Sequence, residues 1–482
     1  MNITHSKVYP FKTDPFEHQL KAWSMSKDKE SFALFMEMGT GKSKVILDTA
    51  AYLYDNGNID TLLIIAPKGA YRNWHINEIP SHLPDHIIYR YAIWSANPRK
   101  KEKKYLEDIV RAGDELRIII MNIEAFSSSR GVKWALSLLN TSRAMMVVDE
   151  STTIKNPNAK RTKAIIKAGT LAKYRRILTG EPVTRDPLDL YSQCEFLDEY
   201  HLGFSSFYSF RNRYAIMVNM NLGNRSFKKV TGFQRTDELN DLLRKFSFRV
   251  KKDDCLDLPE KTYQYRYVDM TKEQEKAYKE MKELCVTTTQ NSVVTVPNKL
   301  AMLGKLHQIV CGHLIDNQGH VTYLNNNRME ALLELTEEVD NKCIIWACYR
   351  ADLLRIAKEL KEKYGADKVV EYWGDTDDKE RKANIIAFTK GNAKFFVANP
   401  ATGGFGLNLQ AANTVIYYSN SYNLEHRLQS EDRCHRIGQK KNVNYIDITT
   451  LKTVDNLIIK SLKSKKDIAT QVMGDQWKEW LR

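Results

Sequence analysis

Short apolar runs recur along the first part of the chain and alternate with stretches whose apolar residues have helical spacing. The runs cover residues 32–36, 61–67, 87–91, 116–121, 144–148 and 174–180. Strands that alternate with helices in this way are typical of a parallel sheet with βαβ crossovers. Ligands of such sheets bind beyond the carboxyl ends of the strands. The pattern therefore predicts an α/β lobe over residues 1–184, with a ligand site at the carboxyl ends of its strands.

A second alternating pattern begins near residue 342 and predicts another α/β lobe over residues 336–482. Its expected strands are residues 343–347, 368–372, 394–398, 414–418 and 443–448. Its expected helices are residues 351–363, residues 424–436 and a basic stretch from residue 454. The fold class that follows is α/β, with two parallel-sheet lobes that carry small helical and hairpin protrusions and are joined by a linker.

Two stretches between these lobes differ from both. Residues 185–250 are rich in aromatic residues, and residues 215–233 predict a β-hairpin that turns at residues 222–225. We expect this stretch to form a protrusion on the first lobe and then to return to it. Residues 251–335 contain charged helices around a Ser/Thr/Val-rich break at residues 286–297. We expect a linker and a second helical protrusion there.

The charge of the chain indicates a class of partner. Of its 482 residues, 73 are Lys or Arg and 59 are Asp or Glu, which gives a net charge of +14. This excess is scattered along the chain and suits a protein that follows a phosphate backbone. A basic protein without a polyanionic partner remains the alternative.

The sequence also indicates a compartment. No apolar run approaches the roughly 20 residues that a membrane span needs, and the polar start does not resemble a signal peptide. We expect an intracellular, monomeric protein from the cytoplasm of a bacterium or of a virus-infected cell, with replication or repair proteins as candidate partners.

The cysteines agree with this compartment. They are dispersed and form no CxxC pair: Cys194, Cys255, Cys285, Cys311, Cys343, Cys348 and Cys434. An odd, dispersed set in a long chain is typical of reduced intracellular proteins. Cys311 and His313 lack a second pair of ligands, so we predict no metal site there.

A glycine turn follows the first apolar run and precedes a predicted helix. Its residues are Gly39, Thr40, Gly41, Lys42 and Ser43. A strand, a tight glycine turn and a helix together let backbone N–H groups converge on phosphate oxygens. Lys42 would reach the β- and γ-phosphates and the Ser43 hydroxyl would bind Mg²⁺. Only the second half of the full motif is present, because Met36 stands at the position of its first glycine, so a chance glycine turn is the alternative.

Two adjacent acids end the apolar run at residues 144–148. Asp149 would hold Mg²⁺ through water, and Glu150 would orient and deprotonate the attacking water. A solvated acidic turn is the alternative, but the position after a parallel-sheet strand favours a catalytic role.

Two arginines stand on the helix expected at residues 424–436. Arg433 and Arg436 are three residues apart, so they would share one face of that helix, and Gly438 would end it. Guanidinium groups from a second lobe can reach the γ-phosphate only when the lobes close, which would make hydrolysis depend on lobe position. A surface helix with salt bridges is the alternative.

Taken together, these residues resemble the superfamily 2 helicase-like ATPases, and within them the Swi/Snf-type DNA translocases. Segments similar to the motifs of that family are residues 16–19, 36–43, 65–74, 122–124, 149–156, 178–182, 246–261, 306–313, 398–409 and 429–439. The last segment contains the sequence HRIGQ and is the most specific to the type. Residues 232–260 look most like its compact branch, which anneals strands and remodels forks.

The resemblance implies RecA-like lobes that use ATP and Mg²⁺ and bind DNA, duplex or branched, without sequence specificity. It implies that Gln19 contacts adenine and that Gly406 and Gln429 belong to the nucleotide site. The residues that it implies for contact with the DNA backbone are Lys68, Asn73, Asn122 and Thr402. The residues that it implies for coupling ATP to the lobe interface are Thr179, Gly180 and Glu181. We expect the neighbouring Trp74 to belong to the core rather than to stack on a base.

Two positions depart from the pattern of the family. Thr152 stands where the family has a histidine, and Glu181 stands where it has threonine or serine. Neither change removes a residue that the phosphate chemistry needs, but coupling to the lobe interface could differ in detail.

Three hypotheses follow. The leading one is a motor that couples ATP hydrolysis to movement along DNA and remodels DNA junctions or DNA–protein complexes. The second is a helicase that separates strands and uses the hairpin at residues 215–233 as a wedge. The third is an ATP-dependent clamp on DNA that does not hydrolyse ATP, which the complete set of catalytic residues disfavours.

Overall fold

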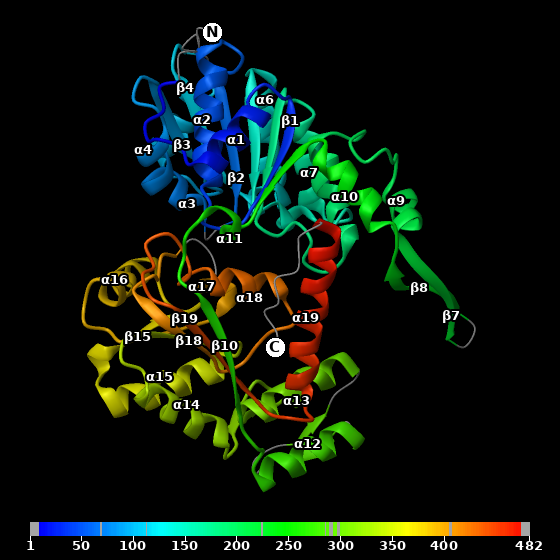
Figure 1. Ribbon diagram of the computed structural model, residues 1–482, viewed down its shortest axis with the longest axis vertical. Helices are drawn as coiled ribbons and strands as arrows, with labels where there is room; N and C mark the ends of the chain where they lie inside the picture. Colours follow the sequence, from blue (N-terminus) through cyan, green and yellow to red (C-terminus); the bar gives the residue numbers. More distant parts are fainter. Residues whose placement is uncertain are drawn as a thin grey trace, which may run out of the picture. The chain divides into compact units, whose positions relative to one another are not determined.

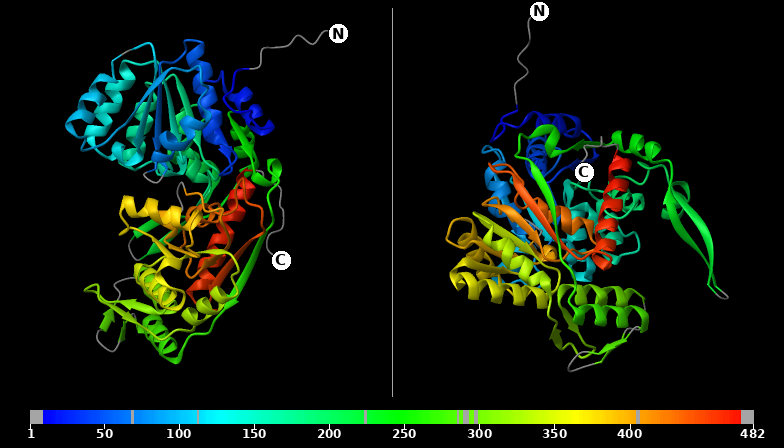
Figure 2. Two further views of the ribbon diagram at one scale, coloured as in Figure 1. Left: turned by 90° about the vertical axis from the view of Figure 1, so that its left-hand side faces the viewer. Right: turned by 60° about the horizontal axis from the view of Figure 1, so that its bottom comes forward.

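The chain folds into two compact units, each built on a parallel sheet (Figures 1 and 2). The computed structural model describes residues 9–67, 70–111, 113–222, 225–284, 286–288, 293–295, 299–403 and 407–473. Unit 1 comprises Met1–Leu256 and Lys465–Arg482, and unit 2 comprises Asp257–Ser464. The α/β class with two parallel-sheet lobes is therefore confirmed.

Unit 1 contains a sheet of seven parallel strands in the order β3-β4-β2-β5-β6-β1-β9. The strands are β1 (Ser31–Met36), β2 (Thr61–Ala66), β3 (Tyr89–Ile93), β4 (Leu116–Asn122), β5 (Ala144–Asp149), β6 (Tyr174–Leu178) and β9 (Ser247–Val250). All six apolar runs that predicted strands in this lobe are strands. The order matters for function because β5, β6 and β1 are neighbours, so the chain segments that follow them leave the sheet side by side.

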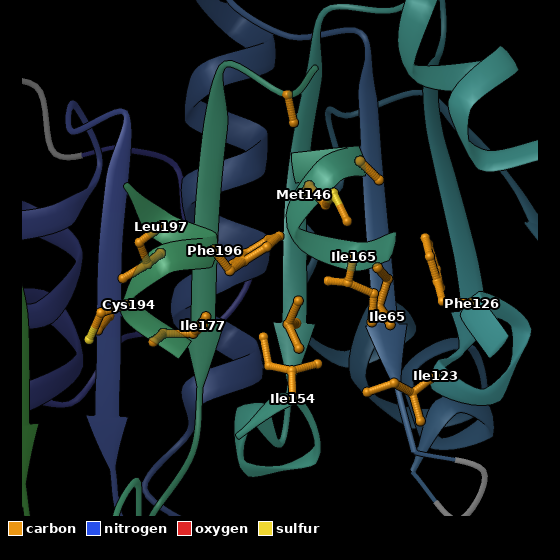
Figure 3. Packing of buried hydrophobic residues seen from close by; sticks show 14 of the residues in the cluster. Ile65, Ile123, Phe126, Met146, Ile154, Ile165, Ile177, Cys194, Phe196 and Leu197 are labelled. Atoms are coloured by element: carbon orange, nitrogen blue, oxygen red, sulfur yellow. The ribbon is translucent and has the colours of Figure 1, made fainter. Parts of the chain in front are cut away.

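Helices cover both faces of this sheet. They are α1 (Glu17–Ser26), α2 (Lys42–Asp55), α3 (Tyr71–Asn73), α4 (Ile79–His82), α5 (Lys100–Asp108), α6 (Ser129–Asn140), α7 (Lys160–Gly169), α8 (Leu190–Leu197), α9 (Phe207–Tyr214), α10 (Thr236–Arg244) and α11 (Lys252–Cys255). Successive residues of a strand point to opposite faces, and on β2 Leu62 and Leu63 accordingly belong to two different hydrophobic clusters. Figure 3 shows one of them, in which Ile65, Met146 and Ile177 from three strands meet Ile165 and Phe196 from the helices.

The predicted hairpin is also confirmed. Strands β7 (Ala215–Leu222) and β8 (Arg225–Phe233) pair with each other in an antiparallel two-stranded sheet and extend away from the seven-stranded sheet (Figure 1). Residues 223–224 of the expected turn lie outside the described residues.

Unit 2 contains six parallel strands in the order β10-β19-β18-β15-β17-β16. They are β10 (Lys261–Tyr267), β15 (Lys342–Trp346), β16 (Val369–Tyr372), β17 (Phe395–Ala398), β18 (Ala412–Tyr417) and β19 (Val443–Thr449). The helices of this part of the chain are α12 (Lys272–Leu284), α13 (Lys299–Cys311), α14 (Asn327–Glu337), α15 (Arg350–Tyr364), α16 (Asp378–Thr389), α17 (Pro400–Gly403), α18 (Leu424–Glu431) and α19 (Val454–Met473), the last of which continues into unit 1.

Four short strands complete unit 2. They form two antiparallel pairs, β11 (Val286–Thr288) with β12 (Val293–Thr295) and β13 (His313–Ile315) with β14 (Val321–Tyr323). The first pair lies within the Ser/Thr/Val-rich break at residues 286–297, whose residues 289–292 and 296–297 lie outside the described residues.

The prediction of a helix at residues 424–436 is wrong for its last five residues. Helix α18 ends at Glu431, and the chain continues in turns. The helix ends there because its next carbonyl groups and side chains have partners elsewhere in unit 2. The Leu409 N–H donates to the Arg433 carbonyl at 3.0 Å, and the Cys434 side chain is fully buried in a hydrophobic cluster. Arg433 and Arg436 therefore do not share a helix face.

Three expectations about absences concern only the described residues. None of their helices is long and apolar enough to cross a membrane. The six cysteines among them form no disulfide. No group of three His, Cys, Asp or Glu side chains among them could hold a metal ion, and His313 instead lies 2.8 Å from Asp352 through Nδ1 and Oδ1.

Candidate nucleotide site

The glycine turn after β1 has the backbone conformation that a phosphate-binding loop needs. Gly39 and Gly41 have φ angles of 82° and 90°, a region that favours glycine, and α2 begins directly afterwards at Lys42. Gly41 also has no room for a side chain, because an added Cβ would lie 2.2 Å from Nε2 of Gln19. Helix α2 therefore begins close to the carboxyl end of β1, and the first N–H groups of a helix are the ones that can bind a phosphate.

Lys42 is held at the end of β1. Its Nζ donates to the carbonyl oxygen of Met36 at 2.8 Å and to that of Glu37 at 3.4 Å, and the residue is buried. Backbone carbonyl groups at the end of β1 thus give the buried ammonium hydrogen-bond partners. These contacts keep the charge at the point where the loop leaves the sheet.

Two side chains of α1 bind the loop. Nε2 of Gln19 donates to the Thr40 carbonyl at 3.1 Å, and Nε2 of His18 lies 2.8 Å from the same oxygen. The Phe16 N–H donates to Oε1 of Gln19 at 3.1 Å, so both ends of that amide have partners. The contact of Gln19 with adenine stays a prediction. The contact of His18 with the loop was not predicted, because its position beside Gln19 is its only signal in the sequence.

The acidic pair lies at the end of β5, two strands away from β1. Oδ2 of Asp149 accepts a hydrogen bond from Nε1 of Trp74 at 2.9 Å, and its Oδ1 accepts one from the Glu150 N–H at 3.0 Å. Burial raises the pKa of the Asp149 carboxyl above its ordinary value, whereas the Trp74 hydrogen bond and the Lys42 ammonium lower it. The Lys42 ammonium is thus close enough to Asp149 to lower the pKa of its carboxyl.

Glu150 has a strained backbone. Its φ of 50° and ψ of 62° place it in the left-handed region, which residues with side chains rarely adopt. The residue is buried, and the 3-10 turn that follows it, η3 (Ser151–Ile154), is anchored by the fully buried Ile154 (Figure 3). Strain of this kind persists where the surrounding structure fixes it, and it is common at functional sites.

Ser43 and Asp149 are the residues that could hold Mg²⁺. Both offer oxygen ligands, which Mg²⁺ prefers, and Mg²⁺ is commonly bound by one or two carboxylates together with the phosphates of the substrate. The donor set therefore fits the ion.

Trp74 is a core residue, as expected, but it also fixes Asp149. A Trp74→Phe change should raise the Mg²⁺ concentration for half-maximal ATP hydrolysis about 10-fold, because a hydrogen bond to a charged group contributes about 1.5–3 kcal/mol. Mg²⁺ titration of the hydrolysis rate measures this effect. Trp94→Phe is the matched control, since Trp94 is also buried but lies in the other cluster. An equal shift in both variants would contradict a specific role for Trp74.

The loop after β6 contacts the glycine turn. An added Cβ on Gly180 would lie 3.1 Å from the Met38 nitrogen, so the two backbones pass closely. The Glu181 N–H donates to Oγ1 of Thr179 at 3.2 Å. The three residues implied in coupling thus form one small turn beside the glycine turn.

Arg249 of β9 accounts for one departure from the family pattern. Its guanidinium donates to the Gly180 carbonyl and, at 3.3 Å, to the Phe35 carbonyl. The same group lies 3.6 Å from Oε1 of Glu181. Glu181 therefore forms an ion pair with Arg249, which a threonine or serine at this position could not form. Arg249 was missed because nothing in its sequence neighbourhood signals this contact.

A second set of contacts joins the acidic segment to the loop after β6. Oγ of Ser151 donates to Oε1 of Gln193 at 2.7 Å, and Nε2 of Gln193 donates to the Pro182 carbonyl at 2.8 Å. Nζ of Lys155 donates to Oγ1 of Thr184 at 2.6 Å. Thr152 is buried beside these contacts. Because of these hydrogen bonds, a displacement of either segment would also displace the other.

In unit 2 the two arginines meet although they do not share a helix face. Nη1 of Arg433 and Nη1 of Arg436 each donate to the Leu407 carbonyl at 3.2 Å. Arg433 is buried and also donates through Nε to the Gln429 carbonyl at 2.8 Å, whereas Arg436 is partly exposed. Gln429 is buried on α18. Gly406 lies outside the described residues.

The residues expected to touch DNA have local partners or lie outside the described residues. Nδ2 of Asn73 donates to Oε1 of Glu78 at 2.7 Å, and Oδ1 of Asn122 accepts from the Ala125 N–H at 3.1 Å. Thr402 lies in α17 and is partly exposed, and Lys68 lies outside the described residues. The geometry assigns the two asparagines a structural role and leaves their contact with DNA as a hypothesis.

In unit 1 the glycine turn, the acidic end of β5 and the loop after β6 lie at neighbouring strands of one parallel sheet. This arrangement defines a P-loop type of α/β protein, and this chain has a second parallel-sheet unit as well. A model of the SNF2-related domain matches residues 16–314, and one of the helicase conserved C-terminal domain matches residues 327–438. The chain belongs to the SNF2-related family.

Several known proteins are similar to this chain. It is 26% identical to the putative ATP-dependent helicase/translocase YwqA of Bacillus subtilis, over 99% of this chain and 51% of that protein. It is 25% identical to the transcription regulatory protein SNF2 of Saccharomyces cerevisiae, over 91% of this chain and 26% of that protein. The solved SWI2/SNF2 ATPase core of Sulfolobus solfataricus in complex with dsDNA aligns over 97% of this chain and 95% of that chain, with a TM-score of 0.42 and 24% identity. The chain spans about half or less of the length of these two curated relatives.

Proposed function

We propose that this protein hydrolyses ATP and uses the reaction to move along DNA and to remodel DNA junctions or DNA–protein complexes. The observation that carries the proposal is that the glycine turn, Asp149 and the turn at Thr179 follow three neighbouring strands of one sheet, in a chain of the SNF2-related family. The names of the similar proteins, which include a putative ATP-dependent helicase/translocase, support the same activity.

The chemistry assigns a role to each side chain at these strand ends. Backbone N–H groups of the glycine turn and the Lys42 ammonium bind the phosphates of ATP. Ser43 and Asp149 would hold Mg²⁺, which would neutralise phosphate charge when bound. Glu150 accepts a proton from the attacking water as the oxygen–phosphorus bond forms, and ADP leaves with the electron pair of the broken bond. The family resemblance implies that Gln19, Gly406 and Gln429 also belong to the nucleotide site.

Arg433 and Arg436 are assigned different tasks. A guanidinium beside the transferred phosphoryl group stabilises the negative charge of the transition state. Such electrostatic stabilisation is the largest single contribution to catalysis in many enzymes. Arg436 is the more exposed of the two, so we assign it this contact. Arg433 holds the backbone between residues 407 and 429 through its hydrogen bonds and positions its neighbour.

DNA is the proposed polymer for two reasons. The net charge of +14 suits a phosphate backbone, and the family resemblance implies DNA contacts at Lys68, Asn73, Asn122 and Thr402. Backbone contacts carry no sequence information, so binding would be independent of sequence. We also retain the finer division into lobes, protrusions and linker at residues 1–184, 185–250, 251–335 and 336–482 as part of this proposal.

The first test is ATP hydrolysis without nucleic acid and with single-stranded, duplex or forked DNA or RNA. We expect the rate to rise mainly with duplex or forked DNA. A rise mainly with single strands would favour the strand-separating helicase instead. A rise with RNA alone, or no rise with any polymer, would contradict the proposal.

A further inference from the structure

The β7–β8 hairpin lies in a stretch of 36 residues that contains basic residues but no acidic one. In the whole chain 59 of 482 residues are Asp or Glu, but residues 201–236 contain none. The same stretch contains Arg211, Arg213, Arg225, Lys228, Lys229 and Arg235. Arg213 and Arg235 pair with Glu238 at the base of the hairpin. The cations that suit a polyanion are therefore those of the hairpin itself, among them Lys228 and Lys229.

The two faces of the hairpin differ in chemistry. Ile216, Val218 and Met220 alternate along β7 and therefore share a face, where they are 44%, 47% and 42% exposed. Lys229 is opposite Val218 and lies on this apolar face, whereas Lys228 is opposite Asn219 and lies on the other, polar face. Both lysines are exposed. The hairpin thus presents a cation on each face and a row of apolar side chains on one of them.

The base of the hairpin is firmly attached to unit 1. Arg213 binds Glu238 through two hydrogen bonds, Nε to Oε1 at 3.0 Å and Nη2 to Oε2 at 2.6 Å, and the Tyr214 hydroxyl donates to the same carboxylate at 3.1 Å. The Gln234 N–H donates to the Tyr214 carbonyl at 2.9 Å and closes the ribbon at its root. The arm is therefore held in a fixed place on unit 1, although its own sheet has only two strands.

An arm of this kind needs a partner to account for its exposed surface. A two-stranded sheet is marginally stable in water by itself, and an exposed apolar row adds nothing to its stability. Apolar side chains gain by insertion between bases where stacking is broken, and lysines gain by contact with phosphates. Unstacked bases and phosphates occur together in nucleic acid at a point where a duplex opens. There one separated strand could lie on each side of the hairpin.

We propose that the β7–β8 hairpin is a second nucleic-acid site of this protein, which binds the junction between duplex and single-stranded DNA. Lys228 and Lys229 contact the phosphates of the two separated strands, and Ile216, Val218 and Met220 contact the faces of unpaired bases. The inference rests on the proposed function in that the polymer is DNA. It goes further, because it assigns branched DNA as the preferred substrate and names the residues that select it.

Charge is tested with a Lys228→Ala, Lys229→Ala double variant. Fluorescence anisotropy measures the binding of labelled forked, blunt duplex and single-stranded DNA without ATP, over a range of salt concentrations. We expect fork binding to weaken roughly 10-fold or more near 0.1 M salt, and the slope of log K against log salt to become shallower by about 1–2. The control is Lys100→Ala, Lys101→Ala, two adjacent exposed lysines on α5. Unchanged affinity and slope in the hairpin variant would overturn the inference.

Base contact is tested separately with an Ile216→Ser, Val218→Ser, Met220→Ser variant. We expect it to lose the preference for forked over blunt duplex DNA while its salt dependence stays that of the wild type. A preference that survives these changes would overturn the assignment of the apolar row. A change in oligomeric state instead of a change in DNA affinity would identify the row as a contact between proteins and would also overturn it.

Removal of the arm gives an independent check. Because the Tyr214 carbonyl and the Gln234 nitrogen are 2.9 Å apart, a Gly-Ser link can replace residues 215–233 without moving the two ends. We expect the ATP hydrolysis rate without DNA to be unchanged and the fork preference to be lost. Failure of the proposed function is distinguishable, since wild-type protein whose ATP hydrolysis ignores DNA would contradict that function, whereas equal fork binding by wild type and variants would contradict the arm alone.

Discussion

A Glu150→Gln variant is expected to bind ATP as the wild type does and to hydrolyse it about 10²–10⁴ times more slowly. The amide has nearly the same shape as the carboxylate but cannot accept the proton of the attacking water. The backbone should keep its conformation, because Ile154 and the Ser151–Gln193 hydrogen bond hold the following turn. The lost rate therefore measures chemistry and not folding.

Phosphate release under single-turnover conditions and binding of a fluorescent ATP analogue measure the two properties. Glu107→Gln is the control, because Glu107 is exposed on α5. Release at the wild-type rate from Glu150→Gln would contradict the role of Glu150 and would revive the hypothesis of a clamp that only binds ATP.

A Lys42→Ala variant, unlike Glu150→Gln, should bind ATP more weakly than the wild type. The ammonium lies beside the glycine turn, where it donates to the Met36 and Glu37 carbonyls. Its removal takes away a charge that would bind the phosphates in the ground state and the transition state. We expect kcat/KM for ATP to fall about 10²–10³-fold, with weaker binding of the ATP analogue.

The structural cost of this change is checked with thermal unfolding and with Lys21→Ala, which removes an exposed lysine from α1. Lys42→Arg adds a sharper test, because it keeps the charge but places a larger planar group beside Gly41. Full activity of a folded Lys42→Ala variant would contradict the assignment of the glycine turn to the nucleotide site.

The central strands of both sheets could be predicted because they are apolar on both faces. β1, β2, β4 and β5 are buried along almost their whole length, so each is a continuous apolar run. The edge strand β10 could not be predicted, since it is mostly exposed and has the sequence KTYQYRY. Its position depends on pairing with β19, which lies more than 170 residues away in sequence.

The site was predictable where function requires residues that are adjacent in sequence. The glycine turn with Lys42, and the pair Asp149 and Glu150, are of this kind. The contacts that position them join distant segments: Trp74 with Asp149, and Arg249 with Gly180. No local pattern marks such pairs, and the early end of α18 before Arg433 likewise depends on a hydrogen bond from Leu409.

Displacement of a third strand from a DNA triplex tests the central claim most directly, because a protein that moves along a duplex must push the third strand off without separating the other two. We predict that the wild type displaces this strand with ATP and that Glu150→Gln does not. DNA-stimulated hydrolysis of ATP by the wild type without displacement of the third strand would contradict the account.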